Sequence, residues 1–410
     1  MYENLAIMGT FIFLYSIVSG GLEKTPINGA LVFMGFGLLI GPLGLGFLNG
    51  DVGSEWLSAL AELTLALLLF ADAANANLGE LKRFSRIPLR LLLIGLPLTI
   101  LLGIGAGAVL FKDLALLEIA ILATMLSPTD AALGKAVVTN KKVPTTIRES
   151  LNVESGLNDG ICVPILFLFL ALVAKTGAEA DTTQLALGLL AEEIGIGAGV
   201  GISLSVIGWL LLKRFNKRGW IAVTGTWIQL PVPALAVACF GVAQWLGGSG
   251  FIACFVGGML FGWLVSNENK HVLLHAAEGT GDTFSLITWV LFGAVVVGHT
   301  IDSLTWQVVV YAVLSLTLIR MLPVFLVLTG MKLRTDEKLF MGWFGPRGLA
   351  SIVFAVIVLN EHLPGGDMIS LTVVCTIVLS VIFHGISATP LVNMLAKRLQ
   401  RAAVEKALHE

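Results

Sequence analysis

Hydrophobic residues recur along this chain in long runs that short polar connections separate. A helix needs about 20 apolar residues to cross the ~30 Å hydrocarbon layer of a bilayer. The pattern therefore predicts an all-α polytopic membrane protein in which residues 1–410 form one transmembrane domain and residues 396–410 a short tail. The thirteen expected membrane-spanning helices cover residues 4–21, 27–48, 56–77, 88–111, 116–139, 148–174, 183–214, 220–246, 249–266, 283–299, 306–329, 339–361 and 369–395.

Lysine and arginine are distributed very unevenly between alternate connections. Twenty of the 25 lie in one set of alternate loops and in the tail, and only Lys112 and Lys175 lie in the other set. The remaining three, Lys135, Arg320 and Arg347, fall within spans. Basic loops stay in the cytoplasm, so we expect the N-terminus outside and the C-terminus inside, in the cell's inner (plasma) membrane.

Composition excludes several classes of protein. Hydrophobic residues make up 56% of the chain and charged residues only 13%, unlike a soluble domain. The net charge of −2 lacks the basic excess expected of a nucleic-acid-binding protein. No phosphate-binding or dinucleotide motif is found, so we expect neither an ATP-driven pump nor a cofactor. The cysteines are far apart within apolar runs, without metal-ligand spacing, at Cys162, Cys239, Cys254 and Cys375.

Two spans contain sequences that interrupt a helix. "MLSPTDAALG" in the fifth span contains Pro128, which removes a backbone donor, followed by Thr129 and Asp130. "WFGPRGLAS" in the twelfth span places Arg347 in a glycine- and proline-rich stretch. If spans 1–6 and 8–13 are inverted repeats, both interruptions occupy the fifth helix of a half. We expect Asp130 to complement positive half-helix ends and Arg347 negative ones, although two simple packing kinks are an alternative.

The sixth span carries the most polar stretch, "ESLNVESGLNDG", at Glu149–Gly160. On a helix, Glu154 and Asn158 share one face, as do Ser155 and Asp159, because each pair is four residues apart. Ionisable groups inside a membrane are expensive and mark ion pathways. We expect Glu154 to pair with Arg320 and Asp130 to neighbour Asp159. The alternative is a hydrogen-bonded packing network without a transport role.

These motifs resemble a known family. "SPTD", "NVESGLNDG", "LIRMLPV" and "GPRGLAS" are similar to sequences in the NhaP-type sodium/proton antiporters, part of the monovalent cation:proton antiporter family that includes the eukaryotic sodium/proton exchangers. The resemblance extends over the whole chain. It implies a homodimer of 13-helix protomers, with dimerisation and mobile core sub-domains interleaved in sequence. Spans 5 and 12 would be unwound and cross each other.

The resemblance also implies roles for particular residues. Asp159 would bind a proton and a cation alternately, and Asn158 would be its partner in an Asn-Asp pair typical of electroneutral members. Asp159, Asp130, Ser155 and Thr129 would form the Na⁺ site, with the Thr129 carbonyl as a ligand. Glu154 and Arg320 would form a structural ion pair, and Arg347 would supply the charge of the second broken helix. Asp72 stands near the position where some relatives supply a glutamate ligand, and its side chain is shorter.

A carboxylate in such a site can hold a proton or a hard cation, but not both well. We therefore expect a secondary antiporter that exchanges Na⁺, and also Li⁺, for H⁺ by alternating access, with a role in pH homeostasis. K⁺/H⁺ exchange is an alternative because oxygen ligands alone do not fix the size of the cation. An intramembrane aspartyl protease is a distant alternative, since Asp130 and Asp159 lack the Tyr-Asp and Gly-x-Gly-Asp contexts that such enzymes need. We expect residues 271–282, which contain His271 and His275, to form an interfacial amphipathic segment.

Overall fold

The computed structural model describes residues 2–22, 25, 28–48, 55–76, 86–130, 132–173, 181–217, 229–265, 267–297 and 303–409. Every regular element among these residues is helical. Seven of the described helices are long and apolar enough to cross a membrane by length and composition, and six further apolar helices of 10–17 residues are shorter. Parts of several predicted loops, including Lys24, Lys82, Arg83 and Lys175, lie outside the described residues.

The helices follow the predicted apolar segments, and several segments are divided. They are α1 (Tyr2–Leu22), α2 (Gly29–Ile40), α3 (Glu55–Asn75), α5 (Arg86–Arg90), η1 (Leu91–Gly95), α6 (Leu96–Leu110), α7 (Leu116–Met125), α8 (Lys135–Val138), α9 (Thr145–Val173), α10 (Asp181–Lys217), α11 (Pro231–Trp245), α12 (Gly250–Leu264), α13 (Asn267–Leu291), η3 (Phe292–Val297), α15 (Trp306–Leu316), α16 (Leu318–Val327), α17 (Thr335–Trp343), α18 (Leu349–Asn360) and α19 (Gly366–His409).

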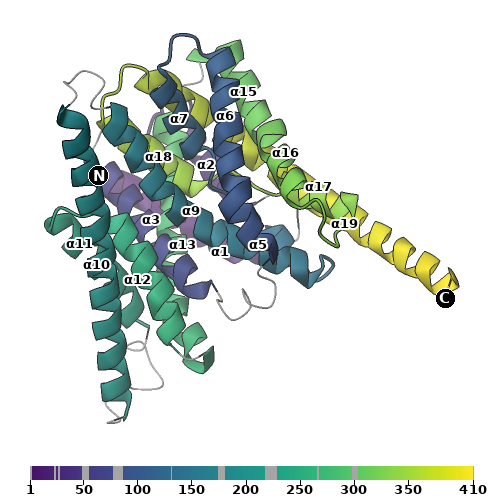
Figure 1. Ribbon diagram of the computed structural model, residues 1–410, viewed down its shortest axis with the longest axis horizontal. Helices are drawn as coiled ribbons and strands as arrows, with labels where there is room; N and C mark the ends of the chain where they lie inside the picture. The colour runs from purple at the N-terminus through teal and green to yellow at the C-terminus, as the bar shows by residue number, and fades with distance from the viewer. Residues whose placement is uncertain are drawn as a thin grey trace.

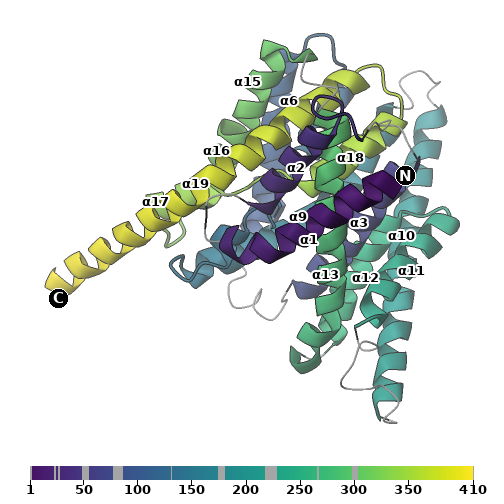
Figure 2. The same ribbon diagram turned by 180° about the vertical axis from the view of Figure 1, so that it is seen from behind.

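The helices pack as two groups, which meet along α3 and α9. In the first group, α12 lies against α3, α10 and α11, and α13 lies against α3 and α2 (Figure 1). In the second group, α7 packs on α6 and α9, α15 and α18 pack on α19, and α16 packs on α17. The contacts of α3 with α9 and α18 join the two groups. Seen from behind, α1 crosses in front of α3, and α19 runs on beyond the other helices to the C-terminus (Figure 2).

Glycines allow the first group to pack closely. The sequence "GIGAGVGIS" in α10 predicts a close-packing face. Two of its four glycines, Gly197 and Gly201, lie directly against α12. A methyl group at either position would overlap main-chain atoms there, whereas Gly195 and Gly199 have open space. The four cysteines are free and buried, as expected for small core residues.

One sequence expectation about helix boundaries is wrong. Residues 271–282 are not a separate interfacial segment, because they form part of α13, which begins at Asn267. One of their polar side chains has a partner on another helix: Asn75 of α3 donates a hydrogen bond to Glu278. The expected span over 306–329 is present as the apolar segment Trp306–Val327, and Thr317, whose backbone angles (φ −112°, ψ −94°) lie outside the helical region, divides it into α15 and α16.

Candidate ion-binding site

Asp159 lies on α9 where the two groups of helices meet. The glycines on either side of it give the helix a flat face: Gly156 lies against the Asp72 backbone of α3, and Gly160 against the Phe255 ring of α12. A methyl group at Gly160 would overlap that ring. Glu154, Ser155 and Asn158 are buried, and Asp159 is partly buried. The predicted polar face therefore points into the protein at the boundary between the groups.

A hydrogen-bonded chain joins this face of α9 to the first helix break, the non-helical segment between α7 and α8 that contains Thr129 and Asp130. The Asn158 Nδ2 atom donates to Thr129 Oγ1 at 2.7 Å, and the Thr129 hydroxyl is 2.9 Å from Ser155 Oγ. Two oxygens beside this chain, Asn158 Oδ1 and Asp159 Oδ1, are buried and have no hydrogen-bond partner. Burying such oxygens without a partner is unfavourable. Asp159 Oδ1 is therefore free to bind a proton or a cation, and Asn158 Oδ1 is free to bind a cation.

Asp130 connects the two helix breaks. Its Oδ1 atom accepts hydrogen bonds from the main-chain N–H groups of Ala132 and Leu133, at 2.7 and 3.2 Å. Its Oδ2 atom accepts from the N–H of Leu349 at 3.1 Å, at the start of α18. The Asp130 N–H also donates to the Pro346 carbonyl at 2.8 Å. One carboxylate thus complements the positive end of α18 and fixes the interrupted segment after α7 to the one before α18.

Arg347 complements the negative end of a helix at the same contact between the two breaks. Its Nη1 atom donates to the carbonyls of Ser127 and Pro128 at 2.8 and 2.9 Å, just beyond the end of α7. A cation at a helix C-terminus is favourable because the carbonyls there carry partial negative charge. The side chain is fully buried, and its Nε and Nη2 atoms have no partner. The two charges therefore complement half-helix ends in the sense that the sequence predicts.

The structure brings Glu154 and Arg320 together. Arg320 donates from Nη1 to Glu154 Oε1 at 2.6 Å and from Nη2 to Oε2 at 2.9 Å, and both side chains are 2% exposed. This two-point contact joins α9 to α16. It occupies both oxygens of the Glu154 carboxylate, so Glu154 has a structural partner whereas Asp159 Oδ1 has none.

Asp72 faces the site from the first group of helices. Asp130 and Asp72 are both charged neighbours of Asp159. Asp72 in turn has Glu278 and Asp282 of α13 as neighbours. Sequence reasoning gave Glu278 and Asp282 no role, because they precede the expected start of that span. Glu278 and Asp282 are four residues apart, so they share one face of a helix, and this spacing could have indicated that both face Asp72.

We predict that Gly348→Ala strongly reduces transport. A methyl group at Gly348 would overlap the Asp130 carboxylate, which must then leave the Leu349 N–H. The rate of cation-dependent proton flux in vesicles should fall with it. Gly105→Ala in α6 is the matched control, because nothing lies within 4 Å of that position. A wild-type rate for Gly348→Ala would show that the contact between the breaks does not matter.

Comparisons with known proteins identify the family of this chain. The family model for the transmembrane sodium/hydrogen exchanger matches residues 9–394. A Na⁺/H⁺ antiporter of Schizosaccharomyces pombe is 26% identical over 370 residues, which cover 86% of this chain and 78% of that protein. The K⁺/H⁺ antiporter NhaP2 of Shewanella oneidensis is 23% identical over 361 residues, which cover 88% of this chain and 61% of that protein.

A solved structure shares the fold. The sodium/proton antiporter MjNhaP1 of Methanocaldococcus jannaschii superimposes with a TM-score of 0.76 at 20% sequence identity, over 94% of this chain and 99% of that chain. The matched family consists of transporters and not of enzymes, which removes the aspartyl protease alternative. The chain belongs to the sodium/hydrogen exchanger family of transmembrane proteins.

Proposed function

We propose that this protein is a secondary antiporter that exchanges Na⁺ for H⁺ across a membrane, and that Asp159 carries either ion in turn. The observation that supports this most is the pair of unpartnered oxygens, Asp159 Oδ1 and Asn158 Oδ1, beside the Thr129–Ser155 contact. Carboxylate, amide, hydroxyl and carbonyl oxygens are the ligands that hard cations prefer. Asp159, Asp130, Ser155 and Thr129 would form the cation site, and Asp72 would face it from α3.

The proposal extends to the whole architecture. Thirteen spans would form two inverted repeats, with the broken helices α7–α8 and α17–α18 crossing at Asp130 and Pro346, whose main chains are hydrogen-bonded. The second group of helices would be the mobile core and the first the dimerisation part of a homodimer. Asp159 lies at their boundary, so sliding of the core would expose it to each side in turn. The basic loops support an outside N-terminus and a cytoplasmic C-terminus in the plasma membrane.

The function is tested with purified protein in proteoliposomes that carry a pH gradient and a pH-sensitive dye. Addition of Na⁺ should collapse the gradient, and Li⁺ should act similarly. K⁺ is added separately, because the K⁺/H⁺ relative from Shewanella makes K⁺ the second candidate. A response to K⁺ alone would establish that alternative. No response to any of the three cations would contradict antiport.

We further predict that exchange is electroneutral, with one proton exchanged for each cation. Asn158 occupies the position beside Asp159 and does not titrate, and both Asp130 oxygens are engaged by main-chain N–H groups of the two breaks. Asp159 would then be the one carboxylate that cycles. The rate should be insensitive to a membrane potential imposed with valinomycin and K⁺ gradients, provided that K⁺ is not itself transported. A rate that follows the voltage would contradict the prediction.

A further inference from the structure

The second helix break removes a specific main-chain hydrogen bond. Residues 344–348 separate α17 from α18. In a continuous α-helix the N–H of Arg347 would donate to the carbonyl of Trp343, four residues earlier. Here the Arg347 N–H donates instead to the Ser380 hydroxyl of α19, at 2.7 Å. The Trp343 carbonyl accepts from Gly345 in a tight turn at 2.8 Å and also lies 2.9 Å from His384 Nε2.

Ser380 and His384 lie next to each other on α19. They are four residues apart, and they are 0% and 2% exposed. His384 Nδ1 is 3.2 Å from the Ser380 hydroxyl and 2.9 Å from the Ser380 carbonyl. The Trp343 ring packs on the imidazole, with the ring centres 5.1 Å apart. A connected path therefore runs from Arg347 N–H through Ser380 and His384 to the Trp343 carbonyl.

The neighbours of the ring determine where its hydrogen lies. Nε2 faces the Trp343 carbonyl, which is only an acceptor, so Nε2 carries a hydrogen. Nδ1 accepts from the Ser380 hydroxyl when the ring is neutral, or donates to the Ser380 carbonyl when the ring is charged. In either form the side chain joins Trp343 to Ser380.

We infer that His384 is a positioning residue for ion exchange: with Ser380 it replaces the missing hydrogen bond between Arg347 and Trp343, and so holds the second break open. The open break places Arg347 on the Ser127 and Pro128 carbonyls. It also places the Leu349 N–H on Asp130. Without His384, the Trp343 carbonyl loses a buried donor, and the direct helical bond competes for Arg347. The inference rests on the proposed function only for its transport measurement.

Two isosteric substitutions separate the two nitrogens. His384→Gln keeps an N–H donor near the Nε2 position, within reach of Trp343, whereas His384→Asn keeps a polar group only near Nδ1. We expect His384→Gln to keep an apparent KM for Na⁺ close to wild type. His384→Asn and His384→Ala should raise the apparent KM about tenfold, the effect of one buried hydrogen bond, because the cation ligands are displaced. Equal KM values for the Gln, Asn and wild-type proteins, or a fall in the maximum rate alone, would overturn the inference.

A measurement without transport tests the contact itself. Nitrogen-15 NMR of histidine-labelled protein in bilayers identifies His384 as the signal that His384→Gln lacks. The inference predicts a hydrogen on Nε2, and a ring with its hydrogen on Nδ1 alone would overturn it. If the wild-type protein exchanges no cation but shows the Nε2 hydrogen, the proposed function fails while the bridge across the break stands.

Discussion

Asp159→Asn is expected to give a folded protein that no longer exchanges cations for protons. The amide keeps the volume of the carboxylate, but it cannot take up and release a proton or offer a negative charge to a cation. Folding should survive because Asp159 Oδ1 has no hydrogen-bond partner to lose. The substitution also leaves no charge to be buried beside Asp72 and Asp130, so thermal stability should stay the same or rise.

The measurement is cation-dependent proton flux in proteoliposomes, with melting temperature recorded on the same preparation. Asp367→Asn is the matched control, because it removes an exposed carboxylate at the start of α19 and should leave the rate unchanged. Exchange by Asp159→Asn at a rate near wild type would refute the role proposed for Asp159. Loss of folding would instead show that Asp159 is a structural residue.

The ion pair between Glu154 and Arg320 should give the largest loss of stability. Arg320→Ala or Glu154→Ala leaves the other charge buried and uncompensated, which costs about 3–5 kcal/mol in free energy of unfolding. The double substitution should cost less than the sum of the two, because neither charge is then left alone. Some exchange should return with it, since neither residue is proposed to bind the ion. Thermal stability of the four proteins measures the coupling.

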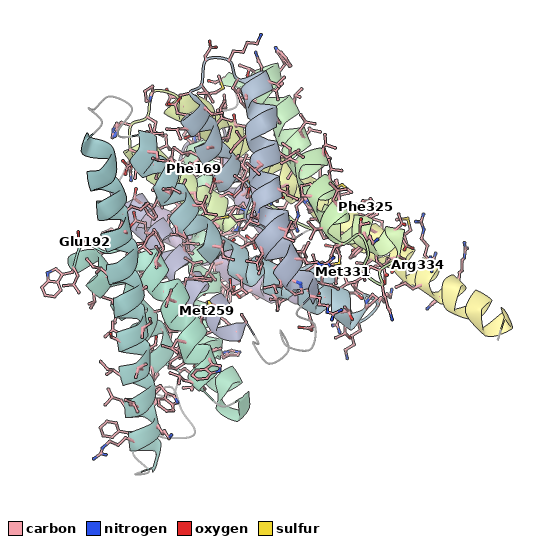
Figure 3. The ribbon with its side chains drawn as sticks, viewed as in Figure 1. Phe169, Glu192, Met259, Phe325, Met331 and Arg334 are labelled. Carbon is pink, nitrogen blue, oxygen red and sulfur yellow. The ribbon has the colours of Figure 1, made fainter. Side chains whose placement is uncertain are left out.

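The partly exposed pair of Arg334 and Asp336 provides the control for this cycle. Arg334 lies at the outside of the molecule (Figure 3). The two atoms of this pair, Arg334 Nε and Asp336 Oδ1, are 3.1 Å apart, and the side chains are 46% and 13% exposed, against 2% for Glu154 and Arg320. Solvent-exposed pairs contribute about 0–1 kcal/mol, so the same substitutions here should show little coupling. Additive losses at Glu154 and Arg320 would mean that the pair contributes nothing as a unit.

Much of the site could be predicted because the residues that interrupt each helix and the charge that stabilises the interruption lie within a few positions of one another in the sequence. Pro128 and the glycines around Arg347 mark both breaks, since proline removes a donor and glycine admits non-helical backbone. The charge beside each break indicates which half-helix end it complements. The pairing of Glu154 with Arg320 could be predicted by the need of a buried charge for an opposite one.

The remaining features depend on contacts between distant segments. Ser380 and His384 lie in a long apolar run, where hydropathy gives no sign that they serve a break more than thirty residues earlier. The start of α13 was misplaced for a similar reason, because Glu278 is polar in sequence but has Asn75 of α3 as its partner. Hydropathy evaluates each segment alone, so it cannot detect a polar residue whose partner lies on another helix.

The central claim is that a proton and a cation compete for Asp159. The most direct measurement is proton release from purified protein in weakly buffered detergent solution, followed with a pH indicator as Na⁺ is added. The account predicts that wild-type protein releases a proton for each cation it binds, that acid weakens Na⁺ binding, and that Asp159→Asn releases none. Binding of Na⁺ without release of a proton, or equal release from Asp159→Asn, would contradict it.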